Sequence, residues 1–135
     1  MSRAGHEIIT SPDLPAPVGY AHAVVAAPGR TVHLGGQTAQ AADGCIAGAT
    51  IVEQFDVAAR NLVTALTAAG GRPEDLVSLQ VYVTDLAAYR TSMRELGGVW
   101  RSHFGRRYPA IAVLGVTGLF DPSALVELVG VAVIP

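Results

Sequence analysis

The last part of the chain carries two strand-length runs that are apolar almost without interruption, residues 110–116 and 124–134. Continuous apolar runs of this length are typical of strands that are covered on both faces, whereas half-exposed strands alternate. The sequence therefore predicts two interior strands, connected by residues 118–123. A chain with such strands must build a sheet and must find cover for both of its sides.

Two further elements follow from residue spacing in the middle of the chain. Thr50 and Glu53 have the spacing of a capping box, apolar residues then recur at three and four positions, and Gly70-Gly71 follows. This pattern predicts a helix that begins after Thr50 and ends before the glycines. Residues 76–83 alternate with a period of two and predict a strand.

Helical spacing returns over residues 86–104 behind Asp85, a residue type that favours helix caps. Gly97 and Gly98 lie inside this segment and cost about 1 kcal/mol each relative to alanine. We expect one second helix, with the two glycines as the point of any bend.

The N-terminal part is rich in proline and predicts an arm over residues 1–17, with a first strand at residues 7–10. Residues 20–27 and 31–34 are short apolar-rich segments separated by a turn that contains Gly29, and they predict a β-hairpin. Cys45 follows in a small, polar stretch, where we expect an exposed loop and a free thiol.

The order of these elements predicts a single α+β domain over residues 1–135, with a mixed sheet and two helices packed on one face. The other face of the sheet then needs a cover that the chain does not contain. Self-association would supply it, and we expect an oligomer.

Composition excludes several classes of function. Nine basic residues against eleven acidic ones give a net charge of −2, which disfavours nucleic acid as a partner. All nine basic residues are arginine, so no lysine can form a Schiff base, bind phosphate in a P-loop or act as a base. No apolar run approaches the roughly 20 residues that cross a bilayer. Without a signal-like start, and with only one cysteine, the expected compartment is the cytoplasm.

Glu127 is the most conspicuous candidate for chemistry, because it is the one carboxylate in the final apolar run. Burial there would suit it to general acid or base catalysis. Two plainer readings stay open: its side chain emerges at a strand edge, or it pairs with an arginine. His22 and His33 are expected to be partly exposed strand residues, and their spacing does not predict a metal site.

Several short motifs occur together in one order and spacing along the chain. They are Pro17-Val-Gly-Tyr20-Ala-His-Ala-Val24, Val32-His-Leu-Gly-Gly-Gln37, Gln54, Asn61-Leu62, Val81-Tyr-Val-Thr-Asp-Leu86, Tyr108-Pro-Ala110, Leu125-Val-Glu-Leu128 and Val131-Ala-Val133. In this combination the chain resembles the Rid family, also called YjgF-like proteins or reactive-intermediate deaminases, over nearly its whole length.

The resemblance implies a chorismate-mutase-like fold, a homotrimer with a central β-barrel, and small-molecule clefts between subunits. It also implies the hydrolysis of imines and enamines such as 2-iminopropionate and 2-aminoacrylate to a 2-oxo acid and ammonia. No cofactor and no metal are used in that reaction.

At the site positions this chain departs from the deaminating members. Ile111 stands where they have the arginine that binds the substrate carboxylate, Gly35 where a serine is usual, and Val113 where they have a cysteine. An aliphatic side chain cannot replace a bidentate guanidinium, so a 2-imino acid should bind poorly.

What the resemblance retains is Tyr20, the backbone of Gly36, and Glu127 at the position of the glutamate that activates the attacking water. Tyr20 and Glu127 are thus the candidate catalytic residues. The candidate substrate-binding residues are Gly35, Gly36, Tyr89, Met93, Arg94, Ile111 and Val113. Arg90 or Arg94 could supply a displaced cation.

Three hypotheses follow. In the first, the chain is a Rid-like enzyme acting on an imine, enamine or related small carbonyl compound through Glu127 and a water, and is not a standard 2-iminopropionate deaminase. In the second it is a non-catalytic trimer that binds a small metabolite or a partner enzyme. The third, the ribonuclease activity attributed to some relatives, is disfavoured by the net charge of −2.

Overall fold

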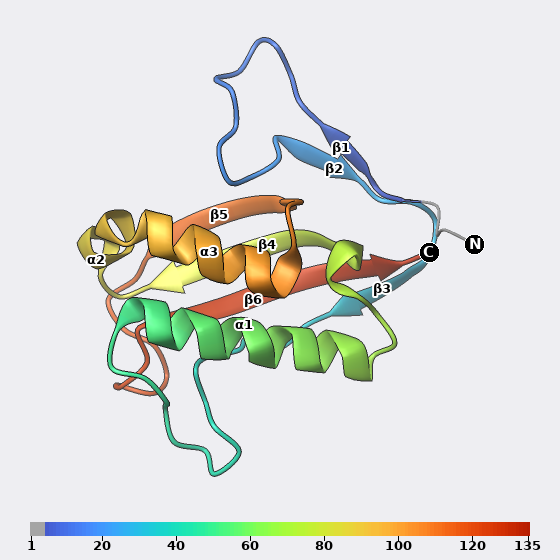
Figure 1. Cartoon of the computed structure of the whole chain (residues 1–135). Helices are drawn as coiled ribbons and strands as arrows, with labels where there is room; N and C mark the ends of the chain where they lie inside the picture. Colours follow the sequence, from blue (N-terminus) through green and yellow to red (C-terminus); the bar gives the residue numbers. More distant parts are fainter. Residues whose placement is uncertain (1–4) are drawn as a thin grey trace.

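The two apolar runs form β5 (Ala110–Gly115) and β6 (Val126–Ile134) in the computed structural model, which describes residues 5–135. They join β3 (Arg30–His33) and β4 (Leu76–Val83) in a sheet of order β3-β6-β4-β5 (Figure 1). β4 and β5 run parallel, while β6 is antiparallel to both β3 and β4. The sheet is therefore mixed, as expected for an α+β domain.

Of the two strands predicted to be interior, only β6 lies inside the sheet. β5 is an edge strand, and its last four residues are exposed, so the prediction for β5 is wrong within one chain. The apolar composition of β5 is thus not explained by burial in the protomer. An exposed apolar edge of this kind is a surface at which another chain can pair or pack.

Three helices, α1 (Ile51–Ala68), α2 (Leu86–Thr91) and α3 (Met93–Phe104), cover one face of the sheet (Figure 1). A short 3-10 turn, Pro73–Asp75, leads into β4. The core between helices and sheet consists of large apolar side chains from both layers. Its members include Phe55, Leu62, Leu66, Leu79, Val81, Leu96, Trp100, Phe104 and Leu128.

The ends of α1 are set as the sequence predicts. The Thr50 hydroxyl accepts a hydrogen bond from the Glu53 backbone N–H at 3.1 Å, and the Glu53 carboxylate accepts one from the Thr50 N–H at 3.1 Å. At the other end Gly70 has a φ of +89°, and Gly71 donates to the Leu66 carbonyl at 2.9 Å. Both motifs satisfy backbone groups that the helix itself leaves free.

The second predicted helix is broken, but not at the glycines. α2 ends where Ser92 donates to the Tyr89 carbonyl at 3.1 Å, and α3 begins directly afterwards. Gly97 and Gly98 lie inside α3. The cost of these glycines is offset because α3 buries three large side chains, Leu96, Trp100 and Phe104, against the core.

The predicted hairpin is also wrong. β2 (Ala23–Val25) pairs with β1 (Glu7–Ile9) in a separate two-stranded sheet, whereas β3 pairs with β6 at the other end of the chain. Gly29, taken as a hairpin turn, has another role: a side chain there would collide with the carbonyl of Ile134. A local turn signal does not identify which strand is the partner.

The N-terminal segment is tied to the main sheet through His6, which is buried. His6 Nδ1 accepts from the Ala27 backbone N–H at 3.0 Å, and its Nε2 donates to the Val133 carbonyl at 2.9 Å. Residues 1–4 of the predicted arm lie outside the described residues.

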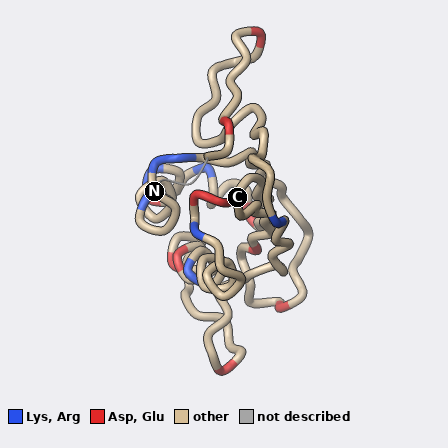
Figure 2. The backbone as a smooth tube through the Cα atoms, turned by 90° about the vertical axis from the view of Figure 1, so that its right-hand side faces the viewer, with Lys and Arg blue, Asp and Glu red and all other residues tan. Residues whose placement is uncertain are grey.

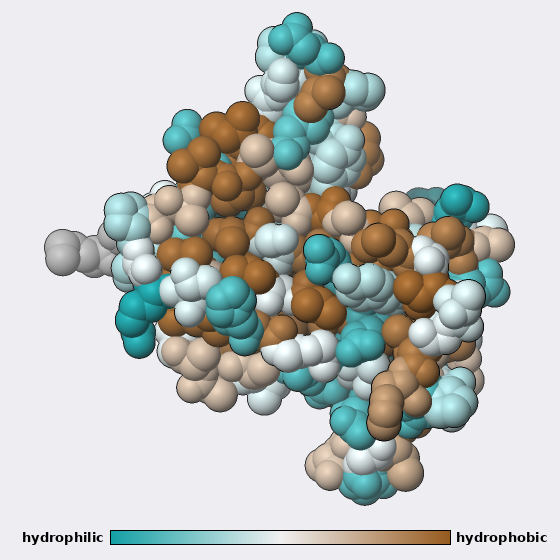
Figure 3. Space-filling view, turned by 180° about the vertical axis from the view of Figure 1, so that it is seen from behind, coloured by the Kyte–Doolittle hydropathy of each residue, from teal (hydrophilic) through white to brown (hydrophobic). Residues whose placement is uncertain are grey.

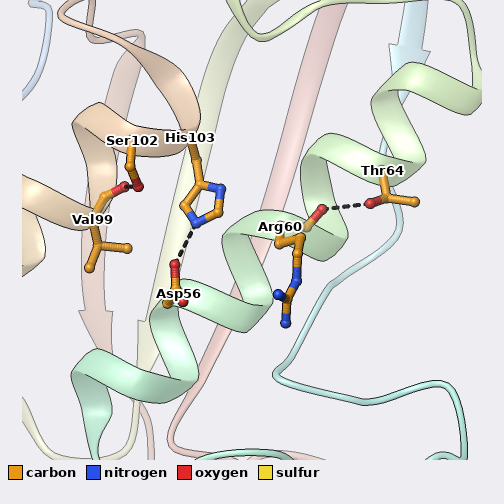
Figure 4. Close-up of polar contacts among 6 residues, drawn as sticks. All are labelled: Asp56, Arg60, Thr64, Val99, Ser102 and His103. Carbon is orange, nitrogen blue, oxygen red and sulfur yellow. Dashed lines mark hydrogen bonds and ion pairs between the residues drawn. The ribbon is translucent and has the colours of Figure 1, made fainter.

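Two side chains connect α1 with α3 at their outer surface. His103 Nε2 and Asp56 Oδ1 are 2.6 Å apart and point toward one another from the two helices (Figure 4). Such a partly exposed pair contributes less than about 1 kcal/mol, so the packing of the helices depends on the apolar core.

The face of the sheet away from the helices, here called the open face, is not covered by any helix of residues 5–135. Figure 3 views this side and shows apolar side chains gathered in patches. They include Leu114, which is 40% exposed, and half-buried residues of β6 such as Val129 and Val131. No helix in residues 5–135 is long and apolar enough to cross a membrane.

Gln54 is a buried polar side chain whose hydrogen bonds are all made. Its amide nitrogen donates to the carbonyls of Gly48 at 3.1 Å and Ser123 at 3.0 Å, and its oxygen accepts from the Leu125 N–H at 2.8 Å. α1 is thereby bonded to the loop that leads into the strand carrying Glu127.

We expect Gln54→Leu to lower the free energy of unfolding by about 2 to 4 kcal/mol, because it leaves buried backbone groups without partners. Urea unfolding at fixed protein concentration measures this. Gln40→Leu is the matched control: Gln40 is exposed and its side chain bonds only to the Gly44 carbonyl in the same loop, so it should lose less than about 1 kcal/mol. Equal losses in the two variants would contradict the role given to Gln54.

Candidate functional site

The sheet separates the candidate residues into two groups. Ile111 and Val113 on β5 are paired with Leu79 and Val81 of β4, which are buried under the helices. Glu127 on β6 is paired with Tyr82 of β4. Tyr82 directly follows Val81 in the strand, so its side chain faces away from the helices. Because cross-strand partners share a face, Ile111 and Val113 lie on the helix side and Glu127 lies on the open face.

On the helix side there is a cavity of about 500 Å³ between β5, α3 and the loop before β2; we call it the helix-side cavity. It brings together six of the nine candidate residues, namely Tyr20, Tyr89, Met93, Arg94, Ile111 and Val113. The remaining lining residues are Val18, Gly19, Phe55, Val81, Leu96, Gly97, Trp100 and Tyr108. The cavity is therefore mostly apolar and aromatic.

Aromatic rings form the inner wall of this cavity. Trp100 stacks on Tyr108 with ring centroids 5.2 Å apart and an angle of 15° between the planes. Its indole N–H donates to the Arg107 carbonyl at 3.3 Å, which fixes the ring. Trp100 is a buried residue of the core, and it also lines the cavity.

The tyrosine hydroxyls of the cavity have no hydrogen-bond partner within the described part of the chain; they belong to Tyr20, Tyr89 and Tyr108. Burial raises the pKa of Tyr89 above its usual value, and the neighbouring Tyr108 raises it further. Tyr89 is therefore protonated at neutral pH and can donate a hydrogen bond to a ligand.

Arg94 is the one charged residue among those that line the cavity. It is exposed, lies in the first turn of α3, and makes no ion pair or hydrogen bond within residues 5–135. Arg90, the other predicted source of a cation, lies on α2 and is not a lining residue. Of the two arginines, the structure brings only Arg94 to the cavity.

Tyr20 reaches the cavity from a loop that is held by His22. The His22 ring accepts at Nδ1 from the Ser11 N–H at 3.0 Å and donates from Nε2 to the Pro15 carbonyl at 2.9 Å. His22 is therefore a loop residue with a bonding role, not the strand residue expected from the sequence. His33 does end a strand, β3.

Gly35, Gly36 and Glu127 form the second group. A side chain at Gly36 would overlap the carboxylate of Glu127: its Cβ would lie 2.9 Å from Cδ and closer still to Oε1. Gly36 therefore has to be glycine for Glu127 to keep this position. Around Gly35 the space is open.

The Glu127 side chain is half-buried on an interior strand, so it does not emerge at a strand edge. Neither an arginine nor a hydrogen-bond donor contacts its carboxylate in the described residues. Both plainer readings of this residue are thus excluded for residues 5–135. The Glu127 carboxylate therefore accepts no hydrogen bond within residues 5–135, and it lies against the backbone of Gly36.

A second cavity of about 430 Å³, here called the edge cavity, borders the same strand β5. It shares Tyr20 and Ile111 with the helix-side cavity but is also lined by Gln80 and Ala112, whose positions face the open side of the sheet. The two cavities thus meet at the exposed edge of the sheet. No group of three or more metal-ligating side chains occurs in residues 5–135.

Sequence reasoning missed part of the cavity lining, above all Tyr108 and Val18. Tyr108 stands in the Tyr108-Pro-Ala110 motif directly before the strand that carries Ile111, and this proximity was the available signal. Val18 is 84% exposed in a loop, and no pattern of the sequence points to it.

The family profile described as Endoribonuclease L-PSP matches residues 10–134. Among solved structures, the Rid-family protein YyfB from Yersinia pestis is similar at 28% identity, with a TM-score of 0.87 over 96% of this chain and 99% of that one. Rv2704 of the YjgF/YER057c/UK114 family, from Mycobacterium tuberculosis, is 33% identical, with a TM-score of 0.64 over 87% of this chain and 88% of that one.

RidA from an Antarctic Psychrobacter species is 27% identical, with a TM-score of 0.68 over 95% of this chain and 99% of that one. A comparison with curated proteins finds no match. The profile covers nearly all of the chain, and these structures share its α+β fold. The chain belongs to the Endoribonuclease L-PSP family, the family of the YjgF and Rid proteins.

Proposed function

We propose that the protein is a Rid-like hydrolase of an imine, an enamine or a related small carbonyl compound, with Glu127 activating water in a cleft between subunits of a homotrimer. The observation that carries this proposal is the Glu127 carboxylate, half-buried, without a partner in residues 5–135, and seated against Gly36. Membership of the family supports the class of reaction.

The chemistry needs only water and one carboxylate. Glu127 takes a proton from water while the oxygen bonds to the imine carbon, and the nitrogen is protonated as the carbon–nitrogen π bond opens. The carbon–nitrogen bond of the resulting carbinolamine then breaks, which releases ammonia and leaves a carbonyl compound. One imine and one water are consumed, and no electron acceptor is involved.

The arrangement of the two groups supports a cleft between subunits. Ile111 lies on β5, the exposed edge strand, and Tyr20 lines the same two cavities, whereas Glu127 and Gly36 lie on the open face. A second copy that packs its open face along the β5 edge would bring its Glu127 toward the first copy's Tyr20. The exposed apolar residues of that edge, such as Leu114, favour this contact.

The substrate departs from 2-iminopropionate, because Ile111 lines the cavity where an arginine would bind the carboxylate of a small imino acid. Val113 adds a second aliphatic side chain to the same wall. A ligand that depends on a guanidinium at this position would lose a charge-assisted contact, so a bulkier or less polar substrate is favoured.

The aliphatic lining at Ile111 and Val113 also favours a second candidate function, a non-catalytic trimer that binds a small metabolite or a partner enzyme. A large apolar cavity without the usual anchor is as suitable for binding as for turnover. The ribonuclease named in the family description has less support. Acidic as well as basic positions occur along the backbone (Figure 2), and the net charge of −2 disfavours binding to a phosphate backbone.

We expect Glu127→Gln to lower the rate of imine hydrolysis by about a hundredfold or more, because glutamine cannot accept the proton of the attacking water. Ammonia release from freshly generated imines of apolar amino acids measures this. Glu95→Gln, the same change at an exposed residue outside the cavity, is the control and should react like the wild type. If Glu127→Gln keeps the full rate, the hydrolase proposal fails.

We expect Ile111→Arg to raise the hydrolysis of 2-iminopropionate above the wild-type rate, by about tenfold or more, since it adds a carboxylate-binding cation to the cavity wall. Parallel assays compare both proteins after each is shown to have the same oligomeric state. Equal rates with 2-iminopropionate would mean that the missing arginine does not determine the substrate.

We expect Leu114→Glu to prevent assembly, because it places a charge on the exposed apolar edge strand. The wild type should sediment with the mass of three chains and the variant with the 13.9 kDa mass of one. Thr64→Glu, on the exposed side of α1 (Figure 4), is the control and should remain assembled. A wild type that sediments as one chain would refute the trimer.

A further inference from the structure

We infer that the helix-side cavity binds a molecule with one aromatic ring and one carboxylate, and that Arg94 is the residue that binds the carboxylate. The inference rests on the proposed function in taking this cavity as the substrate site. It goes further by stating which class of compound fits. It also assigns the binding of the carboxylate to Arg94 on α3, because β5 has Ile111 in place of an arginine.

The size and walls of the cavity favour a ring. Its volume of about 500 Å³ lies in the range of roughly 300–1,000 Å³ that is common for ligand sites, and a three-carbon imino acid would contact only a small part of it. Phe55, Trp100 and Tyr108 contribute aromatic surface, against which a planar ring can pack edge to face or in an offset stack. Ile111 and Val113 add aliphatic groups to the lining.

The charge in the cavity favours one acidic group. Arg94 is its only charged lining residue, and no carboxylate of residues 5–135 neutralises it. It also lies in the first turn of α3, where the helix dipole favours an anion. A bound carboxylate would thus interact with the guanidinium in a bidentate pair and with the positive end of the helix.

The tyrosine hydroxyls add donors near this charge. Tyr89 is protonated at neutral pH, and both Tyr89 and Tyr108 have hydroxyls without a partner in the described residues. A phenol can donate to a carboxylate or to a carbonyl oxygen but cannot replace a missing cation. These hydroxyls therefore suit a ligand that carries oxygen atoms beside an apolar body.

Trp100 makes binding measurable without catalysis. It is the single tryptophan of the chain and lines the cavity, so its fluorescence reports directly on occupancy. We would titrate the assembled protein with 3-phenylpropionate, with its uncharged amide, and with propionate, which has the charge but lacks the ring. The same titrations would be made with Arg94→Gln and with Arg60→Gln, a matched change at an exposed residue of α1 outside the cavity.

We expect 3-phenylpropionate to bind at least tenfold more tightly than either of the other two compounds. Arg94→Gln should weaken the acid by about tenfold to a hundredfold and leave the amide unchanged, whereas Arg60→Gln should match the wild type. The inference is overturned if the acid does not bind the wild type, if acid and amide bind equally, or if Arg94→Gln binds the acid like the wild type.

The two proposals can fail separately. Binding of the acid through Arg94 by a protein that hydrolyses no imine would refute the hydrolase and leave the ligand class standing. Hydrolysis that depends on Glu127, combined with equal binding of acid and amide, would refute the ligand class alone. Because Arg94 is exposed and unpaired in residues 5–135, its replacement should not affect folding, and thermal unfolding checks this.

Discussion

A sheet that is covered by helices on only one face leaves its other face to be covered by something else, and this constraint governs the whole molecule. Side chains of a regular strand alternate between the two faces, so the core residues Leu79, Val81, Val126 and Leu128 require their neighbours to face the open side. Glu127 is one of these neighbours. Its position is a direct consequence of burying Val126 and Leu128.

The same alternation divides the site. Ile111 and Val113 share the helix side with the core, and no rotation of a side chain can bring them to Glu127 through the sheet. Within one chain the sheet lies between the two groups, and Tyr20 and the edge cavity lie at its β5 edge. This separation by strand geometry supports the proposed cleft between subunits, independently of the apolar surface.

The parts of the fold that depend on local signals were predictable from the sequence. The capping box at Thr50 and the glycines after α1 predicted where this helix begins and ends. The period of two predicted the strand β4. Pairing over long distances was not predictable in this way: β3 joins the last strand of the chain, and the turn residues before it carry no information about that partner. The helix does not break at Gly97 and Gly98, the point of any bend expected from the sequence, because core packing, which is tertiary, outweighs the local cost of these glycines.

The site was predictable only in part, for a related reason. A carboxylate in an apolar run identified Glu127 by itself, whereas Ile111, Val113 and Arg94 became candidates only through the resemblance to a family. The roles of Tyr108 and Trp100 in the cavity could not be predicted, because an aromatic residue of the core and one that lines a cavity occur in the same sequence pattern. Whether an aromatic ring contacts other side chains or an open cavity depends on the packing of the whole chain, which the sequence pattern does not reveal.

The hydrogen bonds of His6 have a consequence for the topology of the chain. They connect the residue directly before β1 with the carbonyl of Val133 in β6, the last strand, so the two ends of the described fold lie close together. A short linker between them would close the backbone into a ring. New termini could then be opened at the exposed turn of Asp43 and Gly44, outside every named strand and helix, to give a circular permutant with the same sheet order.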